Sequence, residues 1–147
     1  MTHPLEETYR WFTKAVPVPT TTNIRVQLGV HLEEVEEMLR ELHTSDYTTM
    51  ILLEATRKNL QDLCWHLKEV ETSLVFPDRR ATLDAICDQL VTGTGFAYML
   101  GLDPIGGLLE VNESNWSKFV DGEPQFDQNN KIKKGPGYRK PDLSPFV

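Results

Sequence analysis

The sequence of 147 residues is poor in basic charge, since 15 Lys and Arg stand against 22 Asp and Glu for a formal net charge of −7. Phosphate backbones recruit basic surfaces, so this balance excludes a general nucleic-acid binder. No apolar run approaches the roughly 18 residues that span a bilayer, and the N-terminal residues lack a signal-peptide pattern. We therefore expect neither a nucleic acid nor a membrane as a partner.

Cysteine is also scarce. The two cysteines, Cys64 and Cys87, form no CxxC pair and cannot build a disulfide framework. Both stand in apolar helical patterns, where a free cysteine acts as a small buried hydrophobe. This usage indicates a reducing, intracellular setting, so we expect a cytoplasmic protein.

A helical period dominates the first 119 residues. Apolar residues recur at spacings of three and four, as at Leu28, Leu32, Val35 and Leu39, which marks one face of a helix. The pattern predicts helices at residues 4–15, about 24–43, from a cap at 45–46 to about 74, about 79–101 and about 103–119. With no β-hairpin signal in this part, it predicts an all-α protein, a bundle of about five helices that forms the core (1–119) of a single domain (1–147).

Residues 120–147 differ in both pattern and charge. They hold seven Gly and Pro residues and no period, which predicts an extended irregular C-terminal arm that is either disordered or ordered against another surface. Residues 1–117 carry 9 basic and 18 acidic side chains, net −9, whereas residues 118–147 carry 6 and 4, net +2. An acidic body with a basic arm is the first indication of function.

Two acidic clusters stand on separate predicted helices. Glu33, Glu34 and Glu37 fall within about one turn, and Asp84 and Asp88 lie four residues apart on one side of their helix. Aspartate is unfavourable in a helix interior, yet it occurs there twice. Hard carboxylate oxygens without His or Cys are ligands for Mg²⁺ or Mn²⁺, so the clusters predict a metal site. The alternative is a solvated helix face.

The arm supplies a third candidate cluster. Basic residues gather around Gly-Pro-Gly-Tyr at residues 135–138, namely Lys118, Lys131, Lys133, Lys134, Arg139 and Lys140. The candidates for phosphate binding are Lys118, Lys131, Lys134 and Tyr138. A basic loop with glycines brings backbone N–H and ammonium groups onto phosphate oxygens. Beside carboxylate-held Mg²⁺, such a loop is suited to polyphosphate chemistry, in which lysines neutralise the leaving pyrophosphate. The alternative is an ordinary basic tail.

Four segments resemble a known family. LEEVEEML (32–39) and DAICDQLVTGTGFAYMLGLD (84–103) are similar to the EExxE and ExxD elements of the MazG-like all-α nucleoside triphosphate pyrophosphohydrolases. EVNESNWSK (110–118) and KGPGYRKPDL (134–143) resemble the C-terminal signature of phage and bacterial members. The chain is thus similar to a phage-type member, which places it in the cytoplasm of a host cell if it is viral.

The resemblance implies Mg²⁺-dependent hydrolysis of a (deoxy)nucleoside triphosphate to the monophosphate and pyrophosphate, with two or more Mg²⁺ or Mn²⁺ ions per site. It implies metal ligation by Glu34, Glu37 and Asp88, with Glu33 as a further ligand or as the residue that positions the attacking water. Catalysis would rest on these four residues. Phosphate contacts are implied for Lys118, Lys134 and Tyr138, and positions in the same cleft for Asn112 and Asn115. Family members are homodimers or homotetramers built from two dimers.

The chain departs from the family pattern at two places. The acidic residue three before Asp88 is replaced by Ala85, so we assign Asp84 as the substitute metal ligand, as in members with a DxxxD pattern. The stretch 44–79 matches nothing in the family that we can name and predicts an additional helix. A core or interface helix is favoured there over a site.

The base is the least specified feature. Trp11 and Phe12 are candidates to stack on it and Asn23 to read its edge, although the two aromatics also suit simple packing of a short helix. The phage-type signature favours dGTP or GTP as substrate, with dUTP, dCTP or damaged nucleotides as alternatives. Further alternatives are a phosphoribosyl-ATP pyrophosphohydrolase and, from another class, a non-catalytic helical interaction protein.

Overall fold

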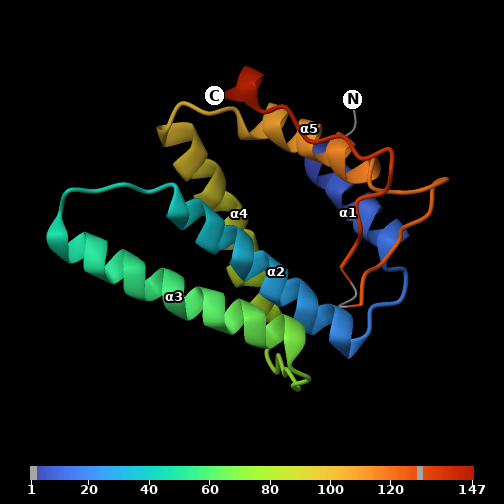
Figure 1. Ribbon diagram of the computed structural model, residues 1–147, viewed down its shortest axis with the longest axis horizontal. Coiled ribbons are helices and arrows are strands. Elements are labelled where there is room, and N and C mark those ends of the chain that lie inside the picture. The colour runs from blue at the N-terminus through green and yellow to red at the C-terminus, as the bar shows by residue number, and fades with distance from the viewer. Residues whose placement is uncertain (1–2, 129–130) are drawn as a thin grey trace. The chain divides into compact units, whose positions relative to one another are not determined.

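A computed structural model describes residues 3–128 and 131–147, while residues 1, 2, 129 and 130 lie outside the description. The all-α prediction is confirmed: the described residues form α-helices and no named strand (Figure 1). The α-helices are α1 (Pro4–Ala15), α2 (Thr21–Arg40), α3 (Tyr47–Glu69), α4 (Arg79–Met99) and α5 (Pro104–Trp116), followed by the 3₁₀ turn η1 (Ser144–Phe146). No helix in the described ranges is long and apolar enough to cross a membrane.

Side-chain caps fix where the helices begin. Asp46, Asp78 and Asp103 each accept a hydrogen bond from a backbone N–H in the first turn of α3, α4 and α5. The cap of α2 is Thr20, which forms a capping box with Asn23, so this helix begins three residues before the predicted position. A polar side chain thus satisfies otherwise unpaired N–H groups at each of these starts.

Helix ends differ more from the sequence pattern than helix starts. α3 ends at Glu69 rather than near 74, because Val70 adopts an extended backbone and is followed by Thr72 and Ser73, which compete poorly for helix. α2 and α5 also end before their predicted last residues, but for another reason. Their last turns tighten into 3₁₀ geometry, with hydrogen bonds from residue i to residue i−3, such as that from Phe119 N to Trp116 O. α4 stops as predicted near Gly101, which has a positive φ of 77°.

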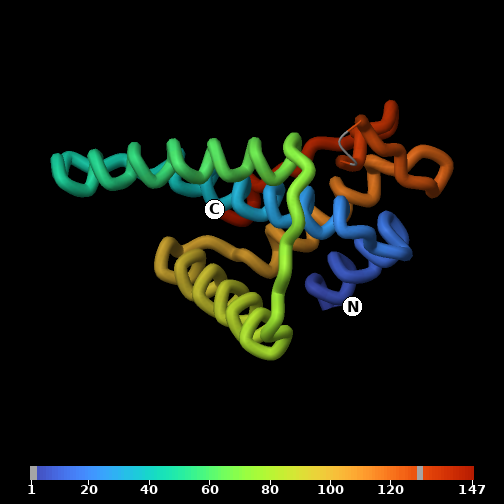
Figure 2. Tube along the Cα trace, turned by 90° about the horizontal axis from the view of Figure 1, so that it is seen from below, coloured from blue at the N-terminus to red at the C-terminus, as the bar shows by residue number. Residues whose placement is uncertain are grey.

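The described residues form two compact units, and each is described by itself. The first comprises residues 1–18, 75–127 and 132–147, and the second residues 19–74 and 128–131. In the second unit α2 and α3 run side by side, as both views show (Figures 1 and 2). Val26, Cys64 and Leu67 are buried between them, and burial raises the pKa of the Cys64 thiol.

In the first unit α1 packs on α5. The ring of Trp11 is buried, stacks on Phe119 at 5.8 Å between centroids, and donates its indole N–H to the Asn115 carbonyl. α4 contacts α5 but has no buried residue, and the apolar residues that recur along it, Leu83, Ile86 and Leu90, are exposed, with Leu83 62 % exposed. The apolar period of α4 therefore does not mark a face that is buried within its unit.

The C-terminal arm is ordered against α5. Ser114 donates its hydroxyl to the Arg139 carbonyl, and Gly135 N donates to the Lys118 carbonyl. At the chain end, Asp103 N donates to the Phe146 carbonyl, and the Phe146 ring lies so close to Gly106 that a Cβ there would be 2.5 Å from it. Of the two states that the sequence left open for the arm, residues 132–147 have the ordered one.

Candidate functional site

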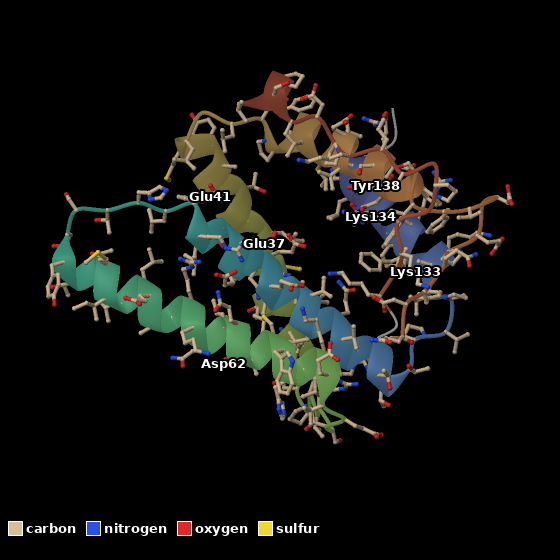
Figure 3. All side chains as sticks on the ribbon, in the orientation of Figure 1. Glu37, Glu41, Asp62, Lys133, Lys134 and Tyr138 are labelled. Atoms are coloured by element: carbon tan, nitrogen blue, oxygen red, sulfur yellow. The ribbon has the colours of Figure 1, made fainter. Side chains whose placement is uncertain are left out.

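The acidic run on α2 is divided by the helical period into two faces. Glu33 and Glu36 turn toward α3, whereas Glu34 and Glu37 are exposed. Within residues 3–128 and 131–147, neither exposed carboxylate makes a hydrogen bond or an ion pair. Figure 3 shows Glu37 on α2, one turn before Glu41, the residue that caps the C-terminal end of the helix. Within the acidic run, Glu34 and Glu37 are thus the two carboxylates without a hydrogen-bond or ion-pair partner in the described part of the chain, and their role as metal ligands stays a prediction.

Glu36 is a structural anchor that the sequence analysis did not single out. The residue is only 2 % exposed, and its carboxylate accepts hydrogen bonds from Arg40 on α2 and from Arg57 and Gln61 on α3. The hydrogen bond from Arg40 is the main cause that holds the pKa of Glu36 below its usual value, and those from Arg57 and Gln61 add to it. This network fixes the rotation of α2 so that Glu34 and Glu37 face away from α3.

Glu33 lies between two lysines. Lys68 Nζ on α3 is 2.6 Å from its Oε1, and Lys131 Nζ on the arm is 3.6 Å from its Oε2. Burial raises the pKa of Glu33, but the hydrogen bond from Lys68 and the charges of both lysines outweigh it and lower the pKa overall. Lys131, which is predicted to bind phosphate, thus lies beside Glu33 on α2.

On α4 the two predicted ligands are likewise open. Asp84 and Asp88 are exposed, and neither side chain has a hydrogen bond or ion pair among the residues that the structure describes. Asp84 also lines a shallow surface depression over the first turns of α4, with Arg80 and Cys87. The spacing of four residues keeps both carboxylates on one side of the helix.

These donors suit Mg²⁺ in type and in number per helix. Each helix offers two open carboxylates, and Mg²⁺ is commonly held by one or two carboxylates with water and substrate oxygens filling the remaining positions. Across the described ranges no three His, Cys, Asp or Glu side chains gather closely enough to hold a metal ion. α2 and α4 belong to different units, so their pairs are described separately.

The basic loop of the arm is built on the C-terminal end of α5. Gly135 approaches the backbone so closely that a Cβ would lie 2.9 Å from the Lys118 carbonyl oxygen, which is why a glycine is needed there. Lys134 Nζ lies 4.7 Å from the centre of the Tyr138 ring, and Figure 3 shows both residues together on the arm. Within the described part of the chain, neither Lys133 nor Lys134 pairs with a carboxylate.

Most residues predicted to contact the nucleotide hold the α1–α5 pair together. Asn112 is buried, donates its amide to the Pro4 carbonyl and accepts from the Thr8 hydroxyl. The Asn115 side chain accepts from Lys118 Nζ, and its backbone carbonyl accepts from Trp11. These contacts give the residues structural roles, and their contacts with a nucleotide stay predictions.

Phe12 and Asn23 occupy different surroundings. Phe12 is partly exposed and meets Trp11 edge to face at 4.9 Å between ring centres. Asn23 belongs to the α2–α3 unit, where its Oδ1 accepts from Thr20 N and from the Thr20 hydroxyl. The role of Asn23 as a helix cap follows from its position three residues after Thr20, a signal that the sequence already contains.

Comparisons with protein-family models, curated proteins and solved structures gave no match to this chain. The functional conclusion therefore depends on the residues and their geometry.

Proposed function

We propose that the protein is a Mg²⁺-dependent nucleoside triphosphate pyrophosphohydrolase of the MazG-like type. The observation that carries the proposal is the ion pair between Lys131 and Glu33, the residue that directly precedes the open carboxylate of Glu34 on α2. A carboxylate pair suited to Mg²⁺ and a lysine suited to phosphate are then neighbours. That combination is what hydrolysis of a polyphosphate needs.

The metal ions would be held by Glu34 and Glu37 on α2 and by Asp84 and Asp88 on α4. When bound, Mg²⁺ or Mn²⁺, with two or more ions per site, supplies charge neutralisation on the phosphates and a more acidic water. The two carboxylate pairs belong to separate units, and the proposed ligand set draws on both helices. The homodimer or homotetramer expected from the family supplies further ways to bring them together.

The basic arm would hold the phosphates. Lys131, Lys134 and Lys118 carry the charge, and Tyr138 orients the Lys134 ammonium group through its ring. The C-terminal end of α5 carries a partial negative charge that favours the lysines around it. Neutralising the leaving pyrophosphate is the step to which these cations contribute.

The substrate that we propose is dGTP or GTP, cleaved to the monophosphate and pyrophosphate. The test is a panel of nucleoside and deoxynucleoside triphosphates with Mg²⁺, with pyrophosphate and orthophosphate measured separately. The proposal expects pyrophosphate, with dGTP and GTP turned over fastest. Preference for dUTP or dCTP would change the substrate, turnover confined to phosphoribosyl-ATP would change the enzyme, and orthophosphate release would refute the bond assignment.

A binding measurement separates an enzyme from a non-catalytic interaction protein. Ligands that bind the native state selectively raise its stability, by about 2.7 kcal/mol at a hundredfold excess over the Kd. Mg²⁺ with a nonhydrolysable triphosphate should therefore raise the unfolding temperature, and neither component alone should match the pair. An unfolding temperature that stays unchanged with every triphosphate would favour the non-catalytic interaction protein.

A further inference from the structure

The additional helix α3 packs closely against α2 at Gly29. A Cβ at this position would lie 2.9 Å from Lys68 Cγ, 3.2 Å from the Cys64 carbonyl oxygen and 3.2 Å from Leu67 Cβ. The alkyl chain of Lys68 therefore runs directly over the surface that the missing side chain leaves free. One turn further along α2 its ammonium group reaches Glu33, at 2.6 Å.

The two lysines at Glu33 differ in how firmly they are held. The Lys68 side chain is 19 % exposed and makes a short hydrogen bond, whereas the Lys131 side chain is 53 % exposed and lies 3.6 Å from the other carboxylate oxygen. Lys68 is thus fixed by packing on α3. Lys131 meets Glu33 at the longer distance and from a more exposed position, so Glu33 Oε2 is the oxygen whose lysine contact is the weaker of the two.

The packing of α2 on α3 has other supports. Arg25 donates its guanidinium to the Leu67 carbonyl at one end of the pair, and Glu36 binds Arg57 and Gln61 toward the other. Along α2, Glu33 lies between Arg25 and Glu36, so this helix is already held against α3 on both sides of Glu33. Glu33 directly precedes Glu34 in the sequence, so its ion pair with Lys68 has a role other than attaching the two helices.

We propose that Lys68 is a positioning residue, which holds the Glu33 carboxylate by Oε1 so that Oε2 faces the attacking water and accepts its hydrogen bond. This inference rests on the proposed function and assigns a purpose to α3, which the family resemblance leaves without one. Lys68 touches neither metal nor substrate in this assignment. It acts through Glu33 alone.

The test compares Lys68→Met with Lys68→Arg, and uses Lys58→Met as the matched control. Lys58 is on the same helix and pairs with Asp62 at 2.6 Å on the exposed surface, so its loss removes a comparable ion pair remote from Glu33. Removing the partner of a catalytic carboxylate typically costs about 10–100-fold in activity, and we expect kcat of Lys68→Met to fall by that factor. KM should change less than about threefold, Lys68→Arg should recover most of kcat, and Lys58→Met should match the wild type.

Two further measurements separate positioning from stability. In a Glu33→Gln background, Lys68→Met should lower kcat by less than about threefold, because the residue through which it acts is already altered. The urea midpoints of Lys68→Met and Lys58→Met should agree. A midpoint that falls together with kcat, a change confined to KM, or full additivity with Glu33→Gln would overturn the inference.

The same assay distinguishes the two proposals. If the wild type releases pyrophosphate and Lys68→Met does so at the same rate, this inference fails and the proposed function stands. If the wild type releases no pyrophosphate from any nucleotide, the proposed function fails and this inference fails with it.

Discussion

Replacing Gly29 with alanine perturbs the contact between α2 and α3, which determines that Glu34 and Glu37 face away from α3. A new Cβ would lie 2.9 Å from Lys68 Cγ, which can yield, but also 3.2 Å from the Cys64 carbonyl oxygen and from Leu67 Cβ, which belong to the packed helix. Overpacking of this kind costs about 1–3 kcal/mol. The gain in helix propensity from Gly to Ala returns about 1 kcal/mol. The free energy of unfolding should therefore fall by about 1 kcal/mol.

The matched control is Gly93→Ala on α4, where no heavy atom lies within 4 Å of the added Cβ. Only the difference in helix propensity between Gly and Ala acts there, so the free energy of unfolding of Gly93→Ala should rise by about 1 kcal/mol. Urea unfolding followed by circular dichroism measures both, and the two variants should differ by about 2 kcal/mol. If Gly29→Ala is stabilised as much as Gly93→Ala, the close approach of α2 and α3 is refuted.

Three further outcomes are expected from the contacts within the α2–α3 and α1–α5 pairs. Glu36→Gln should lower the urea midpoint well below that of the exposed control Glu34→Gln, because it removes the charge at the centre of the α2–α3 network. The hydrogen bond from Arg40 holds the pKa of Glu36 below its ordinary 4.5, so its stabilisation is present above that pH and is lost as the pH falls through the folded value. The gap between Glu36→Gln and the wild type, measured across pH, should therefore narrow below about pH 4.5. Asn112→Ala removes the buried amide that donates to the Pro4 carbonyl and accepts from the Thr8 hydroxyl, and it should cost about 1–3 kcal/mol in the same urea assay, whereas an unchanged midpoint would contradict the α1–α5 contact.

The sequence predicts the helices well because their signals are local. The apolar period of α2 and the caps at Asp46 and Asp103 lie within a few residues of the feature that they specify. Val70 shows the limit, since it continues the apolar period of α3 but takes an extended backbone. The path of the arm along α5 was not predictable, because it depends on partners such as Ser114 and Arg139 that are 25 residues apart.

The candidate site was predictable only in part for the same reason. Residue type and spacing identify the acidic run on α2, but they do not tell which carboxylates are open. From α3, Arg57 pairs with Glu36 and Gln61 donates a hydrogen bond to it, while Lys68 pairs with Glu33. The helical period places Glu33 and Glu36 on one face of α2 and Glu34 and Glu37 on another, but it does not tell which face α3 covers.

The most direct test of the central claim is the rate of pyrophosphate release with Mg²⁺ by the wild type, Glu37→Gln and Asp88→Asn, with Glu41→Gln as control. Glu41 is exposed at the end of α2 and one turn from Glu37, so its substitution changes the same charge outside the proposed ligand set. We expect both ligand variants to lose about a hundredfold or more in rate while Glu41→Gln retains the wild-type rate. Equal rates for Glu37→Gln and Glu41→Gln would contradict the assignment of the open carboxylates to the metal.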